Sequence, residues 1–203
     1  MIKEFNVLIT GVGGQGVILM SELLGKAAVS DGLRVRGSEV LGMAVRGGPV
    51  ISTIRMGSEV YGPLIPAGKG DLVIGMEPAE TLRNITYMSK SSLIILNTQR
   101  VVPVMVFLGK SSYPSLDEIL ERLKANSDKI IKLDAVQLAE EAGSGLSANM
   151  VMLGASFGTG RLPIKIETIK KTMEAHFSAK IAPVNIRAFD LGYLTCQKLL
   201  SKL

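Results

Sequence analysis

The sequence has 203 residues, 47% of them hydrophobic and 20% charged, a balance that suits one globular domain with a sizeable core. The net charge of +5 comes from scattered basic residues and only 4% of residues are aromatic, so the chain lacks the basic stripe and stacking platform of nucleic-acid-binding domains. One cysteine and one histidine exclude an internal disulfide, and a zinc centre or iron–sulfur cluster held by this chain alone.

The sequence contains no run of about 18 apolar residues, so we expect no membrane span, and the N-terminal residues have no signal-peptide pattern. A single cysteine also fits a reducing compartment. We therefore expect a cytoplasmic protein without a membrane partner.

The first elements in chain order are typical of a doubly wound α/β protein. A short apolar run over residues 5–10 predicts a buried strand, and a glycine cluster separates it from a helix over residues 17–30. Asp31-Gly32 forms the turn into a second strand over residues 33–40. This order predicts one Rossmann-like domain over residues 1–203, with an open, largely parallel sheet flanked by helices and a helical C-terminal part.

The rest of the chain predicts more strands and then mostly helices. We expect strands over residues 50–56, 60–65, 71–76, 93–97, 101–108 and 129–134. We expect helices over residues 78–88, 116–125, 136–142, 148–157, 166–177 and 185–202. Ser115 and Glu118 have the spacing of a capping box, and Cys196 lies in the apolar stripe of the last helix, where packing is its expected role.

Glycines are concentrated in the first part of the chain, where 15 of the 22 lie within residues 1–75. We therefore look there for a functional site, because glycine allows unusual backbone angles and close approach. The helix over residues 17–30 has only a narrow polar stripe, and residues 63–66 are largely apolar. Both features predict a surface that a partner covers.

The segment Gly11-Val12-Gly13-Gly14-Gln15-Gly16 matches the G-x-G-x-x-G pattern between a strand and a helix. Such a loop exposes amides at a helix N-terminus that favour a phosphate, and its second glycine normally admits the ligand. The alternative is that the glycines serve a tight turn or a subunit contact. Asp31 and Glu39 are both poorly placed for the acid that binds a ribose about 20 residues on, which argues against binding of NAD or FAD by this chain alone.

Arg46 is a second candidate, because the glycines around it leave its guanidinium free to meet a carboxylate or phosphate. The alternative is an ordinary surface arginine in a flexible loop. His176 closes a predicted helix and is expected at the surface. Glu77 precedes Pro78, so it either starts a helix or serves as a site carboxylate.

Several segments together resemble the γ domains of 2-oxoacid:ferredoxin oxidoreductases, and in particular the β subunit of indolepyruvate:ferredoxin oxidoreductases. They cover about residues 5–195 in the same order and comprise GVGGQG (11–16), GSEVLGMAVRGGPV (37–50), YGPLIPAG (61–68), DLVIGMEPAETLR (71–83), Asn97-Thr98, Asn149–Gly154 and NIRAFDLGY (185–193). Val45 stands where the indolepyruvate β subunit usually has glutamine. This departure leaves a γ subunit of a pyruvate or 2-oxoglutarate enzyme as the alternative.

The resemblance implies an enzyme that oxidatively decarboxylates arylpyruvates, forming acyl-CoA, CO2 and reduced ferredoxin. It implies that thiamine diphosphate and the iron–sulfur clusters belong to a large partner subunit, so that this chain is inactive alone and has neither a catalytic residue nor a metal. Coenzyme A is the ligand it implies for this chain, held by Gly11, Gly13, Gly14, Gln15, Gly16 and Arg46. The isolated chain is also expected to pair with a second copy through the surface meant for its partner.

Three further readings stay open. One is a stand-alone Rossmann oxidoreductase that binds NAD or FAD. Another is an adenylating enzyme similar to the ubiquitin-activating family, although the usual charged set for ATP and the zinc-binding cysteines are not found. The last is an assembly subunit whose glycine loops contact only its partner.

Overall fold

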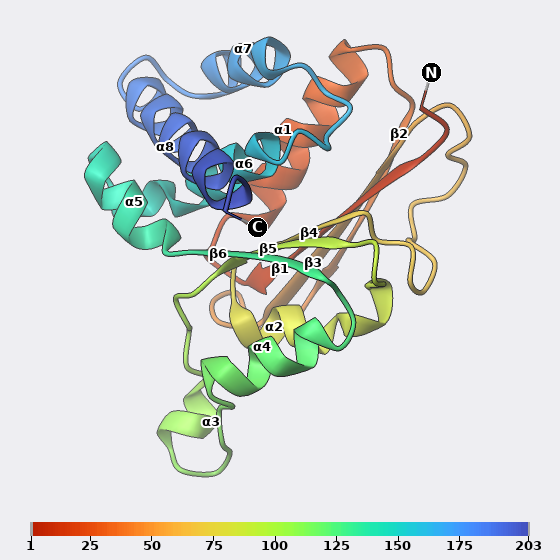
Figure 1. Cartoon of the computed structure of the whole chain (residues 1–203). Coiled ribbons are helices and arrows are strands. Elements are labelled where there is room, and N and C mark those ends of the chain that lie inside the picture. The colour runs from red at the N-terminus through yellow and green to blue at the C-terminus, as the bar shows by residue number, and fades with distance from the viewer. Residues whose placement is uncertain (1, 203) are drawn as a thin grey trace.

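The computed structural model describes residues 2–202, which form a six-stranded mixed sheet with helices on both faces (Figure 1). The strands are β1 (Phe5–Val12), β2 (Val35–Leu41), β3 (Pro49–Met56), β4 (Leu72–Gly75), β5 (Leu93–Asn97) and β6 (Lys129–Leu133). Their order is β2-β3-β1-β4-β5-β6. β1, β4, β5 and β6 run parallel, and β3 is antiparallel to both of its neighbours. The expected open, largely parallel sheet is confirmed.

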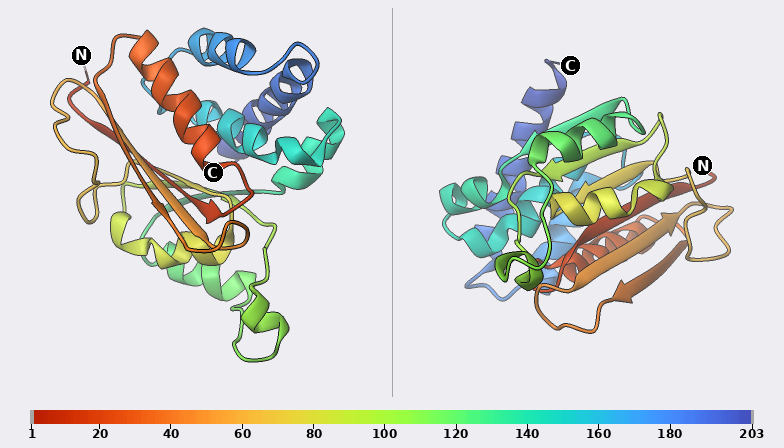
Figure 2. Two further views of the ribbon diagram at one scale, coloured as in Figure 1. Left: turned by 180° about the vertical axis from the view of Figure 1, so that it is seen from behind. Right: turned by 90° about the horizontal axis from the view of Figure 1, so that it is seen from below.

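The β2–β3 hairpin departs from the doubly wound opening, because β3 rather than β2 lies beside β1 (Figure 2). Burial gives the reason. Most side chains of β3 are buried, whereas those of β2 are largely exposed. The more apolar strand therefore takes the inner position, and the short loop over residues 42–48 returns the chain antiparallel to β2.

The helices form one layer on each face of the sheet (Figures 1 and 2). One face carries α1 (Val17–Ser30), α5 (Ala135–Ala142), α6 (Ala148–Gly158), α7 (Ile166–His176) and α8 (Ala182–Leu200). The other carries α2 (Pro78–Arg83) and α4 (Leu116–Lys124). Two apolar cores result, one under each layer. No helix within residues 2–202 has the length and apolarity needed to cross a membrane.

The helices α6 and α8 cross in direct backbone contact, because each carries a glycine at the crossing. A Cβ built on Gly154 would lie 1.9 Å from the carbonyl oxygen of Phe189, and one on Gly192 would lie 1.9 Å from that of Val151. Cys196 is buried in the same layer, and burial raises the pKa of its thiol to about 11. Its surroundings support the expected packing role.

Two predicted strands are wrong. Residues 60–65 lie alongside β3 but do not pair with its backbone as a strand would. Their carbonyls instead accept hydrogen bonds from side chains of β3: Arg55 donates to Gly62 and Leu64, both at 3.1 Å, and Thr53 donates to Pro63 at 3.0 Å. Residues 101–108 contain the single helical turn α3 (Val104–Phe107), which begins after Pro103 and ends before Gly109. Proline and left-handed glycine explain both boundaries of that turn.

Other predicted elements differ only at their ends. The helix expected over residues 78–88 stops at Arg83 and continues as the 3-10 turn η1 (Ile85–Tyr87). It stops there because the Asn84 side-chain amide donates a hydrogen bond to the Glu80 carbonyl at 2.9 Å. The last helix begins at Ala182 with Pro183 in its first turn. The capping box of α4 is confirmed: the Glu118 amide donates to Ser115 Oγ at 3.2 Å and the Ser115 amide donates to Glu118 Oε2 at 2.7 Å.

Candidate functional site

The glycine loop lies at the topological switch point of the sheet. The parallel strands β1 and β4 are neighbours, but β1 leads to α1 on one face and β4 leads to α2 on the other. In open α/β sheets, ligands bind outside the carboxyl ends of the strands at such a point. The loop over residues 13–16 therefore has the position that the motif predicts.

The crevice between the two strand ends is filled by the side chain of Gln15. Its Oε1 accepts from the Val12 amide at 2.9 Å, and its Nε2 donates to the Met76 carbonyl at 3.1 Å. Asn97 donates to the same carbonyl at 3.0 Å and accepts from the Ala135 amide at 3.0 Å. Gln15 thus braces β1 against β4, and its polar atoms are already engaged within the chain.

Gly13 makes room for the chain's own backbone, which gives this glycine a structural role besides the ligand approach expected of it. A Cβ on Gly13 would lie 2.5 Å from the Val45 carbonyl oxygen. The Gly13 amide donates to Gly48 at 2.8 Å, and the Gly47 amide donates to Gly13 at 3.1 Å. These bonds join the glycine loop to the loop over residues 42–48.

The other glycines divide into packed and open positions. A Cβ on Gly11 would lie 2.7 Å from Gln15 Oε1, and one on Gly16 would lie 2.2 Å from Asn149 Nδ2 of α6. Gly16 also has a φ of 74°, so it supplies both the turn and the close packing expected of the last glycine. Gly14 has a φ of 99° and faces open space. Only Gly14 offers an unobstructed approach.

A cavity of about 670 Å³ lies between the start of α1 and the residue 42–48 loop. Among residues 2–202, no hydrogen bond engages the amides of Gly14, Gly16 and the first three residues of α1, all of which line the cavity. α1 also has no side-chain cap and no acidic residue in its first turn. The positive end of its helix dipole therefore faces the cavity without competition, which favours an anion.

The wall opposite α1 is apolar. Leu41, Met43 and Val45 line it and are exposed, and Arg46 lies beside Val45 in the loop, exposed as well. Ile18 adds an exposed apolar side chain from α1 itself. The one ionisable lining residue within the described chain, Glu22, is held by Lys26, whose hydrogen bond lowers the carboxyl pKa. The arrangement suits a ligand with an anionic end and an apolar body.

Asp31 and Glu39, the two acids considered for binding a ribose, do not lie at this cavity. Asp31 accepts from the Lys165 amide and from Thr168 Oγ1, both at 2.7 Å, and so joins α1 to α7. Glu39 is on β2, which β3 separates from β1. Their positions weaken the hypothesis of a stand-alone dinucleotide-binding enzyme.

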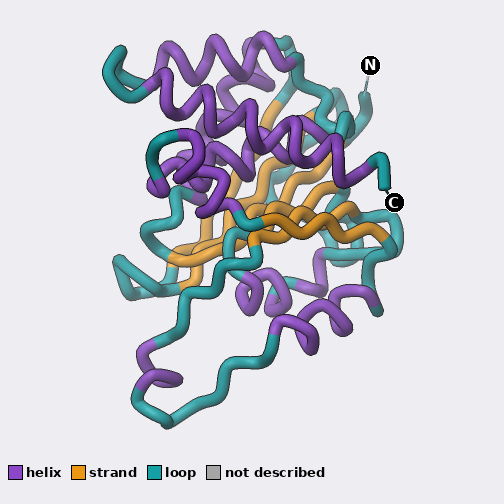
Figure 3. The backbone as a smooth tube through the Cα atoms, turned by 60° about the vertical axis from the view of Figure 1, so that its left-hand side comes forward, coloured by secondary structure: helices purple, strands orange, loops and turns teal. Residues whose placement is uncertain are grey.

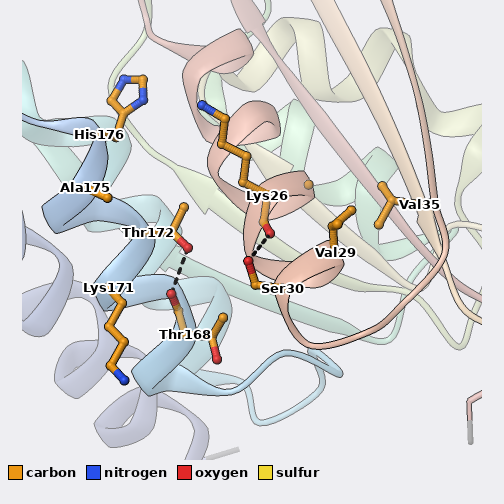
Figure 4. A pocket seen from close by; sticks show the side chains of 10 residues that line it. Lys26, Val29, Ser30, Val35, Thr168, Lys171, Thr172, Ala175 and His176 are labelled. Carbon is orange, nitrogen blue, oxygen red and sulfur yellow. Dashed lines mark hydrogen bonds between the residues drawn. The ribbon is translucent and has the colours of Figure 1, made fainter.

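A larger cavity of about 980 Å³ between α1 and α7 offers fewer free groups (Figure 4). Ser30 Oγ donates to the Lys26 carbonyl at 2.9 Å and Thr172 Oγ1 donates to the Thr168 carbonyl at 2.8 Å, so both hydroxyls serve their own helices. His176 is exposed at the edge of this cavity, as expected of a surface residue. The site at the start of α1 is the better candidate.

Glu77 starts α2, as one of its two predicted roles required. One carboxylate oxygen accepts from the Glu80 amide at 2.9 Å, and the other accepts from the Val101 amide at 3.2 Å and from the Tyr113 hydroxyl. Burial and the Glu77 carboxylate both raise the pKa of Tyr113. Nothing local in the sequence indicated this contact between residues 36 positions apart.

Solved structures share the whole fold. The chain superposes on the gamma subunit of a keto/oxoacid ferredoxin oxidoreductase from Geobacter sulfurreducens with a TM-score of 0.70 and 20% identity, over 96% of this chain and 99% of that one. Subunit PORC of pyruvate oxidoreductase from Thermotoga maritima gives 0.70 and 25%, over 95% and 96%. A 2-oxoglutarate:ferredoxin oxidoreductase chain from Magnetococcus marinus gives 0.74 and 20%, over 98% of this chain and 32% of that one. The fold is that of the gamma subunits of 2-oxoacid oxidoreductases.

Sequence comparisons narrow this class. The model of the family described as pyruvate ferredoxin/flavodoxin oxidoreductase matches residues 6–195. The protein named indolepyruvate oxidoreductase subunit IorB is 40% identical in Pyrococcus horikoshii, over 98% of this chain and 100% of that one, and 40% identical in Archaeoglobus fulgidus, over 94% of each. The chain belongs to the pyruvate ferredoxin/flavodoxin oxidoreductase family, and the resemblance drawn from its motifs is confirmed.

Proposed function

We propose that this chain is the small subunit of an indolepyruvate:ferredoxin oxidoreductase. The observation that carries the proposal is the 40% identity over nearly the whole chain to the IorB subunit of Pyrococcus horikoshii. The pyruvate/ketoisovalerate gamma subunit of Pyrococcus abyssi is only 27% identical, which favours indolepyruvate over pyruvate as the substrate. The single cysteine supports a cytoplasmic location and a larger partner subunit that holds thiamine diphosphate and the iron–sulfur clusters.

Within such a complex, we propose that this chain holds the phosphates of coenzyme A. The open amides of Gly14, Gly16 and the first turn of α1 would donate hydrogen bonds to an anion, and Arg46 would add positive charge at the rim. The cavity volume of about 670 Å³ is within the usual range for small-molecule sites. Coenzyme A supplies the thiol that takes up the acyl group, and the residues of this chain orient it.

The complex is tested by reconstitution with the recombinant large subunit of the same organism. The isolated chain is expected to show no 2-oxoacid oxidation and no iron–sulfur absorption, because redox chemistry of this kind resides in cofactors. Mixing the subunits should yield ferredoxin reduction, with indolepyruvate used better than pyruvate. Ferredoxin reduction by the pure, metal-free chain, or failure of the two subunits to bind, contradicts the proposal.

The coenzyme A site is tested with Arg46→Ala in the reconstituted complex. Loss of a charged hydrogen bond should raise the KM for coenzyme A by about ten- to a hundred-fold. The matched control is Arg36→Ala, an exposed arginine on β2 away from the cavity lining. Gly13→Val is unsuitable for this test, since its side chain would strike the Val45 carbonyl and disturb the loop itself.

A purely architectural role is the second candidate, and the hydrogen bonds between Gly13 and the residue 42–48 loop favour it. The same experiment separates the two. If the Arg46→Ala complex assembles normally and keeps the wild-type KM for coenzyme A, the loops serve assembly alone.

A further inference from the structure

The segment between β5 and α4 stands away from the rest of the molecule (Figures 1 and 3). Its tip carries exposed apolar side chains. Phe107 is 86% exposed and Val104 71% exposed, and Met105 and Leu108 are exposed beside them. We call residues 101–108 the α3 knob. Grouped apolar side chains of this kind mark an interaction site, because isolated soluble domains rarely expose them together.

The backbone of the knob is held in place by hydrogen bonds within this chain. The Phe107 amide donates to the Pro103 carbonyl at 3.1 Å, the Leu108 amide to Val104 at 2.9 Å, and the Lys110 amide to Met105 at 2.9 Å. Gly109, with a φ of 69°, closes the turn. Because its backbone is already ordered, the knob loses little conformational entropy on binding.

The chain enters the knob at Val101 and returns to the domain at Tyr113, and we call these two ends its stem. The buried Glu77 carboxylate holds both of them. The same Glu77 oxygen accepts from the Val101 amide, at 3.2 Å, and from the Tyr113 hydroxyl. Glu77 itself follows β4 and caps α2, so the stem is tied to the sheet. A cavity of about 300 Å³ lies between this stem and the body of the domain. The knob is therefore rigid at its base without being packed onto the protein's own core.

Charge and position indicate what the knob meets. Residues 98–115 contain no aspartate or glutamate, and the basic Arg100 and Lys110 flank the apolar tip. The complementary surface is an apolar pocket with carboxylates on its rim. Val12 lines both the cavity under the knob and the cavity at the start of α1, so the knob and the glycine loop occupy the same end of the molecule.

We propose that the α3 knob anchors this chain to the larger subunit by inserting Phe107 into an apolar, acid-rimmed pocket of that subunit. The inference rests on the proposed function, which supplies the larger subunit. Glu77 and Tyr113 are positioning residues that aim the knob. Docking at this end also brings the partner to the mouth of the coenzyme A cavity.

The test measures the affinity of purified variants for the recombinant large subunit of the same organism. Phe107→Ser should weaken binding about thirty-fold, the effect of losing a central hot-spot residue. Leu146→Ser is the matched control, since Leu146 is 94% exposed in the turn η2 (Gly145–Ser147), beside α5 on the opposite face of the sheet. Its affinity should equal that of the wild type. Both variants should keep the wild-type Tm, because neither side chain is packed inside.

Tyr113→Phe tests the positioning role without touching the tip. It removes one of the two stem bonds, so affinity should fall a few-fold and amide exchange at Val101 should quicken while the tip side chains stay in place. Lys110→Glu should weaken binding further as the salt concentration is lowered, because the introduced charge meets the acidic rim.

The alternatives give distinct results. If the wild type binds the large subunit and Phe107→Ser binds equally well, the knob is not the anchor, although the proposed function stands. If the wild type fails to bind, the proposed function fails and the inference with it. If Phe107→Ser abolishes only self-association of the isolated chain, or only its binding to phosphatidylglycerol vesicles, the inference is overturned in favour of a second copy or a membrane surface.

Discussion

The glycine loop and the crossing of α6 with α8 use the same residue for different purposes. In the loop, Gly13 and Gly47 let two irregular segments exchange backbone hydrogen bonds. At the crossing, Gly154 and Gly192 let two regular helices touch, with hypothetical Cβ contacts of 1.9 Å against 2.5 Å at Gly13. Yet 15 of the 22 glycines lie in the first 75 residues. Glycine density therefore marks where the backbone turns, whereas the tightest packing depends on single glycines in regular helices.

The largest expected effect is at the helix crossing. Gly154→Ala places a methyl group 1.9 Å from the Phe189 carbonyl oxygen, and two packed helices cannot separate locally. We expect the free energy of unfolding, measured in urea, to fall by about 3 kcal/mol or more, the upper range for overpacked cores. A loss below about 1 kcal/mol would show that the crossing is loose and would remove the contrast with the loop.

Gly25→Ala is the matched control within a helix of the same layer. Its Cβ would meet only the Val35 side chain, at 4.0 Å, so no contact is strained. Replacing a helical glycine by alanine where space allows should raise the free energy of unfolding by about 0.5–1 kcal/mol.

A smaller effect is expected in the loop. Gly13→Ala places its methyl group 2.5 Å from the Val45 carbonyl oxygen, but the exposed residue 42–48 loop can shift to relieve the contact. We expect a loss of about 1–2 kcal/mol, together with faster hydrogen exchange at the Gly47 amide, which donates to Gly13. Unchanged exchange at Gly47 would mean that the two loops are not coupled as described.

The smallest effect concerns buried charge, which the crossing avoids and the opposite face of the sheet does not. Glu80 is buried in α2, beneath the knob, whereas α6 has no charged residue and the charged side chains of α8 all have some exposure. Burial raises the pKa of Glu80 above its ordinary value of 4.5. Since the folded state favours the protonated form, the associated stability is fully present below pH 4.5 and is lost as the pH rises through the raised pKa. Glu80→Gln should therefore gain stability relative to wild type as the pH rises above 4.5.

Glu118→Gln gives the opposite slope and serves as the comparison. Hydrogen bonds from the Ser115 amide and hydroxyl lower the pKa of Glu118 below 4.5. Its contribution is thus present above pH 4.5 and lost as the pH falls through the lowered pKa. Denaturant titrations of both variants at several pH values check the signs. Parallel slopes would contradict the assignment.

Much of the fold could be predicted from local signals. The buried strands β1, β4 and β5, the capping box at Ser115 and the helical final third all have a periodicity or cap that acts over a few residues. Strand partners depend on distant residues. The place of β3 beside β1 follows from which hairpin strand is more apolar, and residues 101–108 lack a strand because β5 already pairs on both sides with β4 and β6.

The candidate site was predictable in position and only partly in detail. The motif placed the glycine loop between β1 and α1, and residues 13–16 do lie there, while Gly11 and Val12 form the end of β1. The engagement of Gln15 with Met76, 61 positions away, and of Gly13 with Gly48 depends on tertiary packing, which the motif does not encode. The stem contact of Glu77 with Tyr113 was missed for the same reason.

The hydrogen bond between Asp31 and Thr168 has a consequence for the order in which the chain folds during synthesis. It joins the end of α1 to α7 across 137 positions, and the buried side of α1 packs against helices from the final third of the chain. On the ribosome, the part of α1 that packs on β1, β2 and β3 can be covered early, whereas the part that packs against α6 and α7 stays uncovered until those helices have emerged. Contacts this distant in sequence slow folding and prolong exposure to aggregation. The packing of α1 is thus complete only after the final third of the chain has been synthesised.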